Sequence, residues 1–283
     1  MMAWYQNILV AVDGSEESLH ALREAFKLAD ARSFLAVSVA PPYEGDLRSV
    51  GVNDIKTLIR QPCDTALAAA QKIADEAGVP LKTACVFDEP HAGIVNVAES
   101  ENCDLIVIGA KGRGLLERLL VGSVARRVIG FTKRDVLVVP FKGSLALNKI
   151  MLATDGSENS QPAGNRALEL AQAYGAELKV LSVLELPSPI GGNVREVLAD
   201  LEKSRKNVLT DIRAQAEALG LTTECFTSQG PPARTIVAEA QKQGVNLIVM
   251  GSHGRTGLSR LLMGSVTERV IGLSPCPVLV VKV

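Results

Sequence analysis

Short aliphatic runs alternate with amphipathic stretches along the whole chain. The runs have the length of strands, and the stretches between them place apolar residues three and four positions apart, as on one face of a helix. Leu19, Leu22 and Phe26 share such a face, and Ser15 precedes them as a candidate N-cap. In the first half the pattern predicts strands near 7–13, 34–39, 81–87, 104–109 and 135–140, and helices near 17–30, 63–78, 91–101 and 121–131.

This alternation predicts an α/β fold. Strands that alternate with helices form right-handed βαβ units, which build a parallel sheet with helices on both faces. The composition agrees, because aromatic residues make up only 4% of the chain while apolar residues make up 47%. The core must therefore be aliphatic, as in buried parallel strands.

The pattern also repeats. The segment ILVAVDGSE from Ile8 returns as IMLATDGSE from Ile150, and DLIVIGAKGRGLLERLLVGSVARRVIG from Asp104 returns as NLIVMGSHGRTGLSRLLMGSVTERVIG from Asn246, each 142 positions later. The closing run VLVV at Val136 returns after the same interval at Val278. An interval this long indicates a duplicated domain, since solenoid repeats have periods of about 20–50 residues. We predict two domains, 1–143 and 147–283, with a Lys-Gly-Ser stretch at the seam.

The charge and the apolar runs argue against several partners. The formal net charge is −1 and the basic residues are scattered, so we expect neither nucleic acid nor a membrane surface as a partner. No apolar run approaches the roughly 18 residues that span a bilayer. The five cysteines are dispersed, with no C-x-x-C pair, and the three histidines show no ligand spacing. We expect a cytoplasmic protein without a metal site of its own.

One motif in each half has the features of a phosphate site. Directly after the fourth predicted strand comes Gly-x-x-Gly, then nine residues, then Gly-Ser; we call this the glycine array. The first two glycines allow the backbone to approach a ligand closely, and the Gly-Ser opens a helix whose free N–H groups and dipole favour a phosphate. The glycines could instead serve only as turns, but their recurrence in both halves favours a ligand. The array is neither a Walker A loop nor a dinucleotide fingerprint.

With Val-Asp-Gly-Ser or Thr-Asp-Gly-Ser at the end of the first strand, the glycine array makes the chain resemble the ATP-binding universal stress proteins. The resemblance covers both halves, from about residue 5 to the C-terminus. It implies two tandem Rossmann-like domains, each an open five-stranded parallel sheet of order 3-2-1-4-5. It also implies a nucleotide in the crevice between strands 1 and 4, where the strand order reverses.

The resemblance further implies a set of binding residues. Asp13 and Asp155 would lie beside the adenosine and any Mg²⁺ that accompanies ATP, although a plain turn role suits each aspartate equally well. Val39 and Val183 would contact adenine through their backbone, and His253 is the one histidine placed near a ligand. The ribose and phosphates would lie on Gly109, Gly112, Gly122, Ser123 and Val124 in the first half, and on Gly251, Gly254, Gly264, Ser265 and Val266 in the second.

The two arrays are not identical. The second half follows the family's usual form, whereas the first has Lys111 in place of His253 and the charged pair Asp88-Glu89 after its third strand. We therefore expect the second half to bind nucleotide more tightly.

Three functions fit these motifs. The first is a cytosolic stress-response protein that binds ATP or AMP and acts through nucleotide-dependent conformation or choice of partner. The second is a slow ATPase, although no general base is evident and we assign no catalytic residue. The third is a scaffold that has lost its nucleotide, for which broken arrays would be expected. Because single-domain relatives pair through their closing strands, the resemblance also implies an intramolecular pseudo-dimer of the two halves. It leaves open whether two chains form a homodimer.

Overall fold

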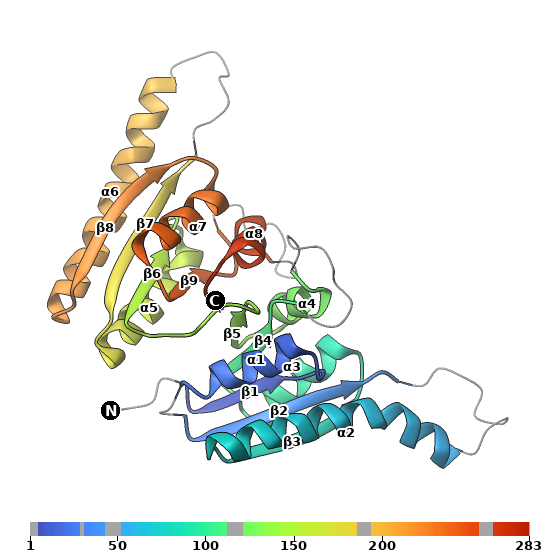
Figure 1. Ribbon diagram of the computed structural model, residues 1–283. Helices are drawn as coiled ribbons and strands as arrows, with labels where there is room; N and C mark the ends of the chain where they lie inside the picture. The colour runs from blue at the N-terminus through green and yellow to red at the C-terminus, as the bar shows by residue number, and fades with distance from the viewer. Residues whose placement is uncertain are drawn as a thin grey trace. The chain divides into compact units, whose positions relative to one another are not determined.

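The chain forms two compact units that divide between Phe141 and Lys142 (Figure 1). The structure is a computed structural model, and it describes residues 5–28, 31–42, 52–111, 121–185, 194–254 and 263–282. The finer domain limits expected from the sequence, 1–143 and 147–283, stay a prediction.

The first unit alternates strands and helices throughout. Its elements are β1 (Asn7–Ala11), α1 (Glu16–Ala25), β2 (Ser33–Ala40), α2 (Val52–Ala77), β3 (Leu81–Phe87), α3 (Pro90–Ser100), β4 (Leu105–Gly109), α4 (Ser123–Phe131) and β5 (Asp135–Val139). The strands form a parallel sheet in the order β3-β2-β1-β4-β5. The predicted strands and helices are thus all present.

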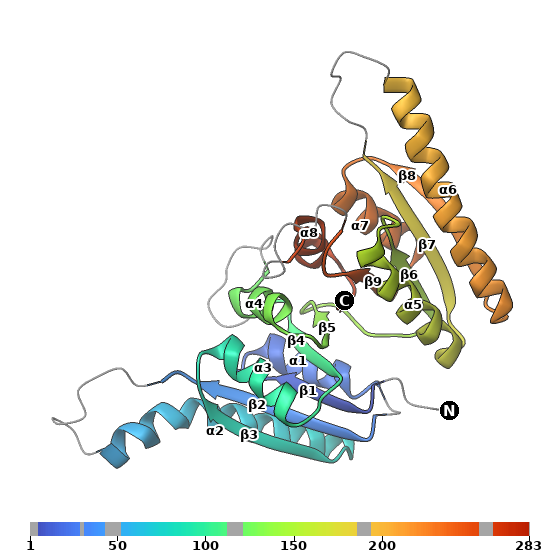
Figure 2. The same cartoon turned by 180° about the vertical axis from the view of Figure 1, so that it is seen from behind.

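The sheet of the first unit lies between two helical layers (Figures 1 and 2). Helices α1 and α2 contact each other on one face, and α3 and α4 contact each other on the other. The central strand β1 pairs with both neighbours, Ile8 lying opposite Phe34 of β2 and Leu105 of β4. Ile8, Leu9 and Val10 of β1 are fully buried, because both faces of the strand are covered by helices.

The second unit repeats this plan. Its elements are β6 (Lys149–Ala153), a 3₁₀ turn (Glu158–Ser160), α5 (Gln161–Tyr174), β7 (Glu177–Leu184), α6 (Val194–Ala218), β8 (Thr223–Gln229), α7 (Pro232–Gln243), β9 (Leu247–Gly251), α8 (Ser265–Leu273) and β10 (Val278–Val281). The strand order is β8-β7-β6-β9-β10, again parallel. The expected α/β fold, with two Rossmann-like domains of five parallel strands in the order 3-2-1-4-5, is therefore confirmed.

The helix bounds differ from the sequence prediction at two places. Helix α2 begins at Val52, not near residue 63, and Pro62 lies inside it. A proline suggests a helix start because it suits the first turn, yet apolar residues spaced three and four apart already precede it here. Helix α1 ends at Ala25, before the predicted 30, because the amides of Lys27 and Leu28 bond three residues back and tighten the last turn.

Candidate functional site

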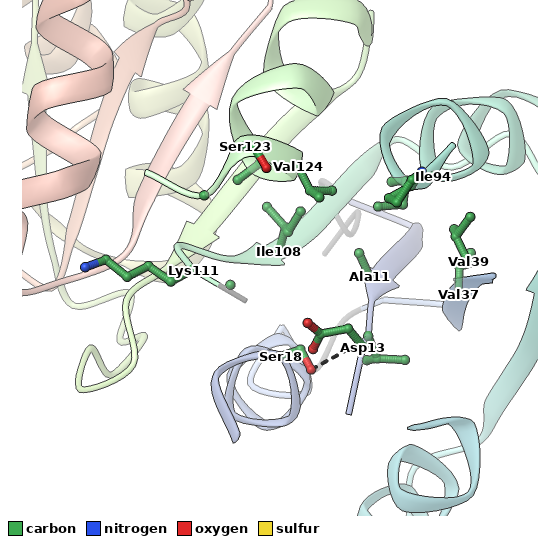
Figure 3. Close-up of a pocket in the computed structure, with 15 residues that line it drawn as sticks. Ala11, Asp13, Ser18, Val37, Val39, Ile94, Ile108, Lys111, Ser123 and Val124 are labelled. Atoms are coloured by element: carbon green, nitrogen blue, oxygen red, sulfur yellow. Dashed lines mark hydrogen bonds between the residues drawn. The ribbon is translucent and has the colours of Figure 1, made fainter. Parts of the chain in front are cut away.

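A cavity of about 240 Å³ opens at the carboxyl ends of β1 and β4 in the first unit. This is the point where the strand order reverses, since β1 leads to β2 on one side while β4 leads to β5 on the other. Figure 3 shows Val37 and Val39 on one side of the cavity and the start of α4 on another. The predicted residues that line the cavity are Asp13, Val39, Gly109, Gly122, Ser123 and Val124. Gly112 lies outside the described residues.

Asp13 shapes the turn that leads from β1 into α1. Its Oδ1 accepts hydrogen bonds from the backbone N–H of Ser15 at 2.9 Å and from the Ser15 hydroxyl at 2.5 Å. Ser15 in turn caps α1, because its Oγ accepts from the N–H of Ser18 at 3.2 Å. The predicted N-cap is confirmed. The turn role of Asp13 is thus present, and the carboxylate also faces the cavity (Figure 3).

The glycine array brings backbone close to backbone at the rim of the first cavity. A Cβ on Gly109 would lie 3.1 Å from the carbonyl oxygen of Lys111 and 3.3 Å from that of Glu17, which is tighter than ordinary contact. The N–H of Gly122 donates to the carbonyl of Ala110 at 2.8 Å, which holds the start of α4 against the end of β4. No side chain of the described residues caps α4 at Gly122, so its first N–H groups are available to an anion.

The second unit has a cavity of about 340 Å³ at the corresponding place, between β6 and β9. The predicted residues that line it are Asp155, Val183, Gly251, His253, Gly254, Gly264, Ser265 and Val266. All the predicted residues of this half therefore lie around one cavity.

Asp155 repeats the geometry of Asp13. Its Oδ1 accepts from the N–H and the hydroxyl of Ser157, at 3.0 and 2.6 Å, and Gly156 takes the positive φ of 70° that this turn needs. The carboxylate lies against the array: a Cβ on Gly254 would be 2.8 Å from Asp155 Oδ2. Only glycine leaves room for the carboxylate at this point.

A backbone hydrogen bond holds the start of α8 against the end of β9, as one does for α4 and β4. The N–H of Gly264 donates to the carbonyl of Ser252 at 2.9 Å, and Thr267 Oγ1 donates to the carbonyl of Gly251 at 3.0 Å. Ser252 Oγ and His253 Nδ1 form a hydrogen bond of 3.1 Å. As in the first half, no described side chain caps the helix start at Gly264.

Sequence reasoning missed a cation in the lining of the second cavity. Arg205 of α6 lines this cavity and is 8% exposed. The residue 142 positions earlier is Cys63, which is buried and does not line the first cavity. A comparison of the two halves at the 142-residue interval would have singled out Arg205, because an arginine there replaces a small apolar residue.

The cysteines have the properties of packing residues. Burial raises the pKa of the Cys85 and Cys103 thiols to about 11, and it also raises the pKa of Cys225 and Cys276. Thiols with raised pKa values stay protonated at neutral pH and react slowly. In the part of the chain that the structure describes, no three His, Cys, Asp or Glu side chains cluster as metal ligands. No helix among the described residues is long and apolar enough to cross a membrane.

The model of the universal stress protein family matches residues 5–140 and again 146–282. The chain belongs to the universal stress protein family. Two matches in one chain make it a tandem, two-domain member of that family.

Relatives of this universal stress protein match it over one half or over the full length. A universal stress protein of Methanocaldococcus jannaschii is 37% identical over 144 residues, which are 50% of this chain and 85% of that protein. One from Mycolicibacterium smegmatis is 28% identical over 295 residues, covering 97% of this chain and 96% of its own length. The crystal structure of a universal stress protein from Archaeoglobus fulgidus has a TM-score of 0.71 at 21% identity, covering 98% of this chain and 96% of that one. The last likeness supports the tandem fold.

Proposed function

We propose that this universal stress protein binds an adenine nucleotide, ATP or AMP, in each half and acts in the cytoplasm through nucleotide-dependent regulation. One observation carries the proposal: each half has a cavity at its topological switch point, bounded by an aspartate, a glycine array and an uncapped helix start. Open α/β sheets bind their ligands at this point. The combination matches a nucleoside with a phosphate group.

The parts of the nucleotide are assigned by chemistry. The backbone of Val39 and Val183, at the ends of β2 and β7, would contact adenine, and Asp13 and Asp155 would accept hydrogen bonds from ribose hydroxyls. Cavities of about 240 and 340 Å³ are near the lower end of the range for ligand sites, roughly 300–1,000 Å³. We therefore place the nucleoside inside the cavity and the phosphates along the helix start.

The arrays fit phosphate in two ways. At Gly254 a Cβ would lie 2.8 Å from Asp155 Oδ2, and at Gly264 it would lie 3.1 Å from the Ser252 carbonyl oxygen, so the array has no room for a side chain at either position. The N–H groups at Ser123 and Ser265 begin helices without a side-chain cap and offer donors to phosphate oxygens. When ATP is the ligand, Mg²⁺ would neutralise its phosphates beside Asp13 or Asp155.

The first test asks whether nucleotide is bound. Purified protein is denatured and the supernatant is examined by absorbance and chromatography, and nucleotide-free protein is then melted with and without millimolar ATP and Mg²⁺. We expect a higher melting temperature, because a ligand that binds only the folded state stabilises it by about 2.7 kcal/mol at 100-fold over Kd.

The same samples separate the alternatives. Phosphate release at a slow, steady rate would identify a slow ATPase. If the melting temperature of nucleotide-free protein does not change with either ATP or AMP, the proposal is wrong and the scaffold function is favoured.

A further inference from the structure

Among the described residues, the second cavity has a buried guanidinium in its lining and the first has none. Arg205 extends from α6 to the end of β6, where its Nη1 donates to the backbone carbonyl of Asp155. The Asp155 carboxylate lies against Gly254, whose Cβ position is 2.8 Å from Oδ2. Arg205, Asp155 and the glycine array are therefore neighbours along one wall of the cavity.

The charges around the two cavities differ as a result. Asp155 and Glu185 line the second cavity, and Arg205 is the one Lys or Arg among the described residues that do so. Without Arg205, two carboxylates would dominate the described part of this lining and disfavour a phosphate. The first cavity has Asp13 and Lys111, and Figure 3 shows the Lys111 side chain directed away from Asp13.

Arginine suits phosphate better than lysine does. Its guanidinium stays charged when buried and offers a planar set of donors that matches a phosphate group. A phosphate next to Asp155 would therefore be a favoured partner.

We propose that Arg205 makes the second site selective for phosphorylated nucleotides, by binding the phosphate nearest to Asp155. The first site, with Cys63 at the matching position, depends on the helix start and Lys111 and discriminates less between adenosine and AMP. This inference rests on the proposed function, because it concerns the ligand of the same cavity.

The test compares adenosine with AMP on the full chain by calorimetry, in unmodified protein and in Arg205→Met. We expect Arg205→Met to weaken AMP binding at the second site about tenfold, the effect of losing a hydrogen-bonded ion pair, and to leave adenosine binding unchanged. Lys206→Met is the matched control, because it removes a positive charge from the neighbouring, exposed position of α6 outside the cavity lining. We expect Lys206→Met to bind both ligands as the unmodified protein does.

Several results would overturn the inference. Equal weakening of adenosine and AMP in Arg205→Met would show that Arg205 only holds the shape of the cavity, and unchanged AMP binding would show that it meets no phosphate. If Arg205→Met does not fold, unmodified protein gives the answer: the AMP-to-adenosine affinity ratio must be larger at the second site than at the first, and equal ratios refute the proposal. Absence of nucleotide binding at both sites of unmodified protein would instead refute the proposed function.

Discussion

Gly122 and Gly264 occupy the same position in the two halves, directly before the helix that borders each cavity. Both have negative φ, near −60°, so a side chain there would be limited by space and not by backbone conformation. A Cβ on Gly264 would lie 3.1 Å from the Ser252 carbonyl oxygen, which is tighter than ordinary contact. These glycines therefore test where the phosphates bind.

We predict that Gly264→Val abolishes nucleotide binding in the second half and Gly122→Val in the first, while the other half still binds. The valine would occupy the space in front of the helix N–H groups. Calorimetry counts the remaining sites, and circular dichroism checks the fold of each variant. Normal ATP binding at both sites in Gly264→Val would mean that the phosphates lie elsewhere.

The same two variants rank the halves. We expect the site that survives in Gly122→Val, the second, to be the tighter one, because its array follows the usual form and Arg205 adds a cation. The acidic pair Asp88 and Glu89 follows β3 in the first half, whereas Gly230 and Pro231 follow β8. Tighter residual binding in Gly264→Val would reverse this ranking.

At the scale of elements, the two halves pack their first helices differently. Leu22 of α1 is fully buried, but the matching residue of α5 is Gly164, next to a hollow of about 300 Å³ between α5 and α6. A Cβ on Gly164 would meet only Leu152 Cδ2, at an ordinary 3.9 Å. There is therefore room for a side chain at Gly164, beside α5.

We predict that Gly164→Ala stabilises the protein by about 0.5–1 kcal/mol, because alanine is the better helix former and fits without a clash. Gly93→Ala is the matched control in α3, where the new Cβ would lie 2.9 Å from Val39 Cγ1. It should destabilise by about 1–3 kcal/mol through overpacking. Urea titrations measure both, and a loss of stability in Gly164→Ala would contradict the hollow beside α5.

At the scale of the whole molecule, the closing strands β5 and β10 each stand last in the strand order of their own half. Both are aliphatic, and an aliphatic edge strand favours pairing with another strand. We predict that the two closing strands pair with each other, which would make the chain a covalently linked dimer of like domains.

Co-expression of residues 1–143 with residues 147–283 as separate chains tests this pairing. We expect the two halves to elute together in size-exclusion chromatography, and each half alone to form a dimer with itself. The full-length protein run beside them reports its own oligomeric state. If the halves stay monomeric both alone and when mixed, the result would contradict pairing of β5 with β10.

The local sequence determined the fold class, the duplication and most of the element positions. Hydrophobic periodicity reflects which face of a strand or helix is buried, and this is a property of neighbouring residues. The 142-residue interval between Asp13 and Asp155 is evident from the sequence alone. The start of α2 at Val52 was misplaced, because Pro62 is a local signal that the rest of the helix overrides.

Only the tertiary structure decided what surrounds each cavity. Asp13 and Gly109 are distant in sequence and meet because β1 pairs with β4, as in the register of Val10 with Val107. Sequence comparison placed these residues through a family pattern, but Arg205 belongs to no such pattern. Its role depends on how α6 packs against β7 and β8 and so brings Arg205 to Asp155. The direction of a helix over a sheet is set by packing between distant residues, which no local pattern encodes.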